Sequence, residues 1–201
     1  MSGPATVPLL SLEQVLGQVR ACDLCRQHLP LGPRPVLVAE ASARLLIVGQ
    51  APGTRVHHTG IPWNDPSGDR LRQWLGLDRA QFYDARRIAI MPMGFCYPGS
   101  GPSGDLPPRP ECAPRWHALI RAQLPRVELT LLVGQYAQRY YLGSRHRSLT
   151  ERVRAWREYG PAYLPLVHPS GRNQRWLAER PWFAREVLPA LRQRVAELLV
   201  D

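Results

Sequence analysis

The chain has 201 residues, of which 44% are hydrophobic and 21% are charged, so we expect one folded domain and exclude a disordered polyelectrolyte. Its formal net charge is +10, and all 26 of its basic side chains are arginine, because the sequence contains no lysine. This excess favours a polyanionic partner such as nucleic acid. No apolar run approaches the ~20 residues that cross a bilayer, and residues 1–16 lack the basic flank of a signal peptide. We therefore expect a cytoplasmic protein without a membrane segment.

Apolar strands and amphipathic helices are expected to alternate along the chain. Ser11 and Gln14 have the spacing of a capping box, which predicts a first helix. Apolar runs predict four strands, over residues 44–49, 87–91, 127–133 and 163–167. Helical periodicity covers residues 68–76, 113–124, 135–142, 148–158 and 173–199, the last interrupted near Pro181 and Pro189. Residues 50–68 and 92–110 are rich in proline and glycine and are expected to be loops.

This order of elements predicts an α/β fold in a single three-layer domain over residues 1–201. A central four-stranded, mainly parallel sheet would carry helices on both faces. Residues 1–43 would form an N-terminal helix and a cysteine-bearing segment, and residues 44–201 the α/β core. Any site is expected where the strands end, because ligands of open parallel sheets bind at the carboxyl edge.

Polar loops follow the expected strands and begin at Gly49, Met93 and His168. On a parallel sheet all of them emerge at one edge. Gln50 and His168 would then face a common cleft, where an amide and an imidazole can donate hydrogen bonds to a ligand. The Pro-Ser-Gly turn after His168 adds backbone amides and a hydroxyl that could hold a phosphate.

Two of these loops carry a family resemblance. Gly49-Gln-Ala-Pro-Gly53 after an apolar strand, paired with His168-Pro-Ser170, resembles the two active-site motifs of the uracil-DNA glycosylase superfamily. Together with the strand and helix around Gly134, the resemblance covers residues 22–173. It implies a base excision repair enzyme that hydrolyses the N-glycosidic bond of uracil, or of a related deaminated base, in DNA. Lyase activity is not expected, because no lysine amine is present to form a Schiff base.

The four cysteines form the pattern Cys22-x2-Cys25 followed by Cys96-x15-Cys112. Four thiolates can hold an iron–sulfur cluster or a zinc ion, and zinc remains an alternative because His28 and His117, which could also bind it, are nearby in the sequence. The pattern is similar to that of the iron-sulfur (family 4) uracil-DNA glycosylases, which implies a [4Fe-4S] cluster. We expect a structural role for it, remote from the motif loops, that ties residues 22–35 and 96–112 to the fold.

The resemblance also implies roles for individual side chains. Gln50 and His168 take the catalytic positions, with His168 as the hydrogen-bond donor to the departing base. Trp63 stands where the family stacks an aromatic ring on the extruded base. The other expected base-binding residues are Ala51, Gly53 and Asn64. The second-motif loop would enter the minor groove of DNA with Ser170, Gly171, Arg172 and Asn173, where Arg172 would act as a wedge or contact a phosphate. Weaker candidates for DNA contact are Arg55, Arg70, Arg72, Arg145 and Arg147, and His57 and His58 could contact base or phosphate.

Two positions depart from the family pattern. Gln50 replaces the glutamate of the iron-sulfur family. It can orient water or contact the base, but it cannot accept a proton. Any general base would have to come from elsewhere, and Asp65 and Asp69 are the nearest carboxylates in the sequence. Pro92 replaces the asparagine that selects uracil, so backbone groups over residues 91–95, or Asn64, would have to read the base. The alternative function is a catalytically weak member that binds uracil-containing or abasic DNA as a recognition module. In either case we expect a monomer.

Overall fold

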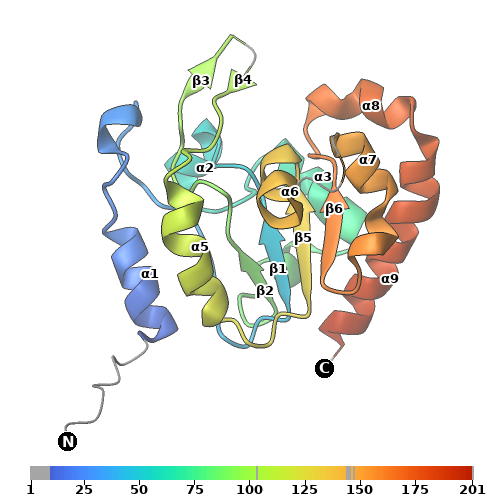
Figure 1. Ribbon diagram of the computed structural model, residues 1–201, viewed down its shortest axis with the longest axis horizontal. Coiled ribbons are helices and arrows are strands. Elements are labelled where there is room, and N and C mark those ends of the chain that lie inside the picture. Colours follow the sequence, from blue (N-terminus) through green and yellow to red (C-terminus); the bar gives the residue numbers. More distant parts are fainter. Residues whose placement is uncertain (1–9, 103, 144–145, 147, 201) are drawn as a thin grey trace, which may run out of the picture.

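The computed structural model describes residues 10–102, 104–143, 146 and 148–200. Its centre is a four-stranded parallel sheet in the order β2-β1-β5-β6 (Figure 1). The strands are β1 (Leu45–Val48), β2 (Ile88–Ile90), β5 (Leu129–Val133) and β6 (Tyr163–Leu166). All four lie within the runs predicted from apolar sequence.

The two faces of the sheet bury alternate side chains of each strand, because successive residues of a strand point to opposite sides. Leu45 and Ile47 pack on one face against α3 (Pro66–Leu75), α9 (Leu188–Leu199) and the π-helical turn Phe183–Val187. Leu46 and Val48 pack on the other against α1 (Leu12–Arg20), α5 (Cys112–Ala122) and α6 (Gln135–Leu142). The predicted α/β fold with helices on both faces is therefore confirmed.

Strand order places a reversal point in the middle of the sheet. From β1 the chain moves outward to β2, and it then returns past β1 to form β5 and β6 on the opposite side. The crevice at such a reversal, outside the carboxyl ends of the strands, is where open parallel sheets bind ligands. Here it lies between the ends of β1 and β5, next to Gly49 and Gly134.

The remaining helices are short. They are α2 (Thr54–Thr59), α4 (Arg79–Phe82), α7 (Leu149–Arg154) and α8 (Gln174–Ala178), with 3-10 turns at Arg26–His28, Trp156–Tyr159 and Gly171–Asn173. In the part of the chain described, no helix is long and apolar enough to cross a membrane.

Both segments expected to be irregular contain regular structure. Residues 50–68 include α2, which ends at Gly60 in the left-handed conformation. Residues 92–110 include an antiparallel hairpin of β3 (Ser100–Gly101) and β4 (Gly104–Asp105). These elements are too short to show a hydrophobic period, and tertiary contacts stabilise them instead. The helix expected over 148–158 is divided into α7 and a 3-10 turn, and Pro189 lies in the first turn of α9, where proline is tolerated.

Candidate functional site

A cleft with a volume of roughly 640 Å3 opens at the carboxyl edge of the sheet. Its walls come from the loops after β1, β2 and β6, from the segment that leads into α3, and from the β3–β4 hairpin. Gln50, Trp63, His168 and Arg172, which lie far apart in the sequence, all line it. So do Ala51, Gly53, Ser170, Gly171 and Asn173.

His168 follows β6 and is half-buried at the cleft wall. Desolvation by the surrounding protein lowers the pKa of its imidazole to about 4, so the ring is neutral at pH 7. Its Nδ1 accepts a hydrogen bond from the Ser170 amide at 3.2 Å. A neutral ring that accepts at Nδ1 carries its hydrogen on Nε2. His168 is therefore held as an uncharged N–H donor.

Trp63 forms an aromatic wall beside this histidine. The two ring centroids are 5.4 Å apart, with an angle of 30° between the ring planes. A β-carbon on Gly49 would lie 2.8 Å from Cζ2 of the tryptophan, so the first residue of the first motif must be glycine for the indole to fit. Trp63 itself adopts a left-handed backbone with φ 57°, which is rare for a bulky residue. Buried Arg72 donates to its carbonyl at 3.4 Å and holds this turn.

Gln50 lies at the reversal point of the sheet. Its side chain covers Gly134, where a β-carbon would lie 2.6 Å from the glutamine Nε2. Gly134 also has φ 90°, so glycine satisfies both the backbone conformation and the close approach. The main-chain carbonyl of Gln50 accepts from the Gly94 amide at 2.9 Å. The motif loop is thus attached to the loop after β2.

The second-motif loop is held from two sides. Asn173 Nδ2 donates to the His168 carbonyl at 2.8 Å, and Arg70 donates to the Ser170 carbonyl at 3.3 Å. Gly171 and Arg172 remain exposed at the rim. This arrangement presents a rigid turn with a guanidinium to whatever enters the cleft.

Within the described part of the chain, two carboxylates line the cleft, Asp65 and Asp105. Oδ1 of Asp65 caps α3 by accepting from the Gly68 amide at 2.8 Å. Oδ1 of Asp105 accepts from the Ser100 hydroxyl at 3.1 Å, and its Oδ2 would lie 3.2 Å from a β-carbon on Gly53. Asp105 was not expected at the cleft, because it lies on the hairpin, in a segment predicted to be a loop without regular structure. Asp69 does not line the cleft; its carboxylate pairs with Arg72.

Several other expected residues lie elsewhere. Asn64 is outside the set that lines the cleft, and its Oδ1 accepts from Arg79 at 3.1 Å. His57 is buried in α2, and exposed His58 faces a neighbouring hollow. Arg72 is a buried structural residue. Arg145 and Arg147 fall outside the described residues.

Pro92 lines the cleft at the end of β2, where the family pattern would have an amide side chain. Its carbonyl is already engaged by Nε2 of His117 at 3.1 Å. Nδ1 of His117 lies 2.7 Å from the Tyr141 hydroxyl, and burial lowers the pKa of this histidine to about 4. His117 therefore connects the end of β2 to α6 as a neutral core residue.

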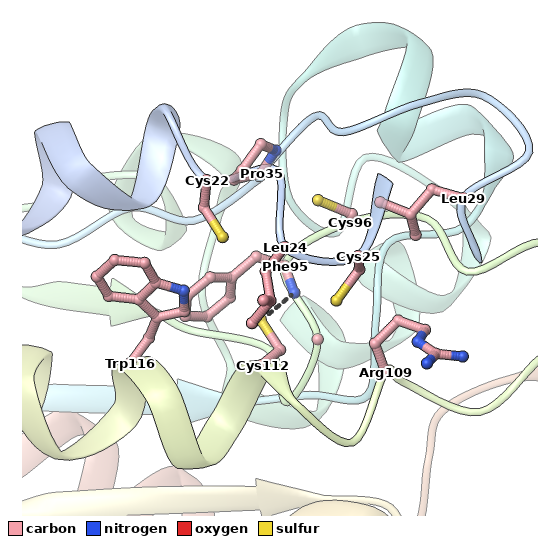
Figure 2. Close-up of a pocket in the computed structure, with 11 residues that line it drawn as sticks. Cys22, Leu24, Cys25, Leu29, Pro35, Phe95, Cys96, Arg109, Cys112 and Trp116 are labelled. Carbon is pink, nitrogen blue, oxygen red and sulfur yellow. Dashed lines mark hydrogen bonds between the residues drawn. The ribbon is translucent and has the colours of Figure 1, made fainter. Parts of the chain in front are cut away.

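The four cysteines lie around a second, smaller cavity between the segment after α1 and the start of α5 (Figure 2). None of the described residues lines both this cavity and the cleft, although Gly94 joins them through its hydrogen bond to Gln50. All four cysteines are free of disulfide bonds. Burial raises the pKa of Cys96 to about 11 and of Cys112 to about 12, so unliganded thiols here stay protonated at neutral pH.

Four cysteine thiolates are the donor set that an iron–sulfur cluster uses. Figure 2 shows the four sulfur-bearing side chains around one space, closed on one side by Phe95 and Trp116. The Phe95 amide donates to the Cys112 sulfur at 3.4 Å, a contact that also suits a ligating thiolate. Neither His28 nor His117 lines the cavity. Among the described residues, no group of three or more His, Cys, Asp or Glu side chains is arranged to hold a metal ion.

Comparison with known proteins matches the chain to one protein family. A family model described as the uracil DNA glycosylase superfamily matches residues 36–192, which include the whole cleft. A solution NMR structure from Methanosarcina acetivorans, of a candidate uracil DNA glycosylase, is similar with a TM-score of 0.47 and 19% sequence identity. That match covers 80% of this chain and 97% of the other.

Proposed function

This chain belongs to the uracil DNA glycosylase superfamily, and on that premise we propose that it hydrolyses the N-glycosidic bond of uracil, or of a related deaminated base, in DNA and leaves an abasic site. The observation that carries the proposal is the meeting of neutral His168 with Trp63 and Gln50 in one cleft. A glycosylase needs such a pocket, because it must extract the base from the stack and hold it by stacking and edge contacts.

His168 stabilises the departing base in this mechanism. Cleavage leaves positive charge on the sugar and negative charge on the base, so an N–H directed at a base carbonyl lowers the barrier. A neutral imidazole suits the task, because its remaining N–H proton is very weakly acidic and stays on the ring while it donates a hydrogen bond to the developing anion. The Ser170 amide keeps the Nδ1 side occupied and orients the ring.

Trp63 and Gln50 would hold the base and the attacking water. The indole offers a flat apolar surface next to the imidazole, suited to stacking on an extracted base. The Gln50 amide has a donor and an acceptor, so it can orient water or meet the amide edge of the base. Because this amide cannot accept a proton, it cannot act as a general base. We propose that the rate depends mainly on dissociation of the N-glycosidic bond and little on general-base catalysis. Uracil itself is the proposed substrate by family membership, since Pro92 offers no side-chain amide.

DNA would be held by the exposed second-motif loop and the positive charge of the chain. Arg172 can form a forked contact with phosphate oxygens. Counterion release then makes binding depend on salt, with a log–log slope of about −0.9 for each phosphate contacted. A binding constant that does not change with salt would contradict this role.

We further propose that Cys22, Cys25, Cys96 and Cys112 hold a [4Fe-4S] cluster rather than zinc. The support is that all four cysteines line one cavity whose other described lining residues include no histidine or carboxylate, since four thiolates are the usual ligands of such a cluster. When bound, the cluster would supply cross-links rather than chemistry on the base. It would tie the segment after α1 to the loop after β2 and to the start of α5.

The decisive experiment incubates a uracil-containing oligonucleotide with the wild type, with His168→Ala and with His146→Ala. His146 lies outside the cleft, where its Nε2 is 3.3 Å from Oε2 of Glu158, and it serves as the control. We expect abasic product from the wild type and the control, and strand cleavage only after alkali, because no lyase activity is proposed. If the wild type forms no abasic product, the proposed glycosylase activity is refuted. Retained binding to uracil-containing or abasic DNA would then favour the recognition module.

A further inference from the structure

The β3–β4 hairpin forms one rim of the cleft. It pairs Ser100 with Asp105 and projects from the body of the molecule on the side of the strands' carboxyl ends (Figure 1). Two consecutive residues at its base, Asp105 and Leu106, line the cleft. A duplex that approaches the cleft must therefore meet the hairpin.

Leu106 is an exposed apolar side chain held in place at this rim. Its side chain is 46% exposed, and its amide donates to the Gly99 carbonyl at 2.8 Å. The two methyl carbons would lie 3.3 and 3.2 Å from β-carbons on Gly99 and Gly101, so they rest on the hairpin backbone. Among the large hydrophobic side chains exposed in the described part of the chain, Leu106 alone lines the cleft.

The hairpin also contacts the loop proposed to enter the minor groove. The Arg172 guanidinium packs over Gly104, where a β-carbon would overlap it. Leu106 and the second-motif loop thus form adjacent parts of one rim. That loop, Ser170 to Asn173, contains no apolar side chain of its own.

Extraction of a base leaves a gap in the duplex. Proteins that unstack DNA commonly insert an apolar side chain such as leucine between the bases, because this replaces lost stacking contacts. We propose that Leu106 is this wedge and occupies the gap left by the extracted nucleotide, while Arg172 contacts the backbone beside it. This inference rests on the proposed function, because a wedge is needed only if a base leaves the stack.

The test compares Leu106→Ala with Leu119→Ala, which removes a leucine of similar exposure (44%) from α5, outside the cleft. Single-turnover excision is measured on a duplex containing a U·G pair and on the same uracil strand alone. Because unstacking costs a few kcal/mol, we expect Leu106→Ala to slow excision from the duplex by about tenfold or more. Excision from the single strand and both rates of Leu119→Ala should stay within about twofold of the wild type.

A second measurement does not require turnover. Leu106→Ala should bind a duplex with a stable abasic site about tenfold more weakly than the wild type, and bind single-stranded DNA equally well. If Leu106→Ala loses affinity equally for duplex and single-stranded DNA, or loses none for the duplex, the proposal that Leu106 is the wedge is overturned. If the wild type excises from neither substrate, the proposed glycosylase fails, and the abasic-duplex comparison alone decides for or against Leu106.

Discussion

Replacement of His168 tests the proposed chemistry most directly. The ring supplies one hydrogen-bond donor from Nε2, because the Ser170 amide occupies Nδ1 and the pKa of the imidazole is about 4. Removal of one preorganised donor to a developing anion costs about 10²–10³ in rate. We therefore expect His168→Ala to lose this factor in single-turnover excision. His168→Gln, whose amide reaches toward the Nε2 position, should lose less.

The pH dependence separates a neutral donor from a charged one. With a pKa of about 4, His168 stays neutral from pH 8 down to about pH 5, so the rate should not rise as the pH falls through 6.5. The assay quenches a labelled uracil oligonucleotide at set times and cleaves the abasic product with alkali. A rate for His168→Ala within tenfold of the wild type would refute the donor role. A wild-type rate that follows protonation near pH 6.5 would refute the neutral ring.

Three further outcomes are expected. If bond dissociation dominates, Asp65→Asn and Asp105→Asn should each lower the single-turnover rate less than about tenfold, and a loss of 10² or more would identify that carboxylate as a general base. Burial lowers the pKa of His117 and His168 to about 4 in the folded protein, so below pH 6.5 the unfolded chain binds more protons than the folded one. The free energy of unfolding, measured with urea, should therefore fall from pH 6.5 toward pH 4, by up to about 1.4 kcal/mol per pH unit for each histidine. A free energy of unfolding that does not change over this range would contradict the burial of the two histidines. Protein purified without oxygen should be brown and contain iron, and Cys96→Ser should lose both colour and thermal stability, whereas a colourless protein with stoichiometric zinc would exclude the cluster.

The strands and the two motif loops could be predicted from the sequence. Apolar runs of five to seven residues indicate buried parallel strands, and all four strands of the central sheet lie within those runs. The order of strands and helices then requires that the loops after them meet at one edge, which is why Gln50 and His168 were expected together. The structure brings them into one cleft.

Short elements and long-range contacts escaped prediction. The β3–β4 hairpin has two residues in each strand, too few for a pattern, so Asp105 and Leu106 gave no signal as residues of the cleft. Asn64, adjacent to Trp63 in sequence, was expected at the base but lies against Arg79 instead. The left-handed turn at Trp63 separates these neighbours, and no periodicity reports such a turn.

Sequence by itself determined the fold class, the family motifs, the cysteine set and the arginine-only charge of +10, because burial and chemical identity are encoded locally. Tertiary structure alone decided which groups share the cleft. Gln50 covers Gly134, Arg172 packs over Gly104, and Leu106 stands at the rim, through contacts between segments many residues apart. Such contacts depend on how strands and loops pack in three dimensions, and this packing cannot be predicted from side-chain patterns along the chain.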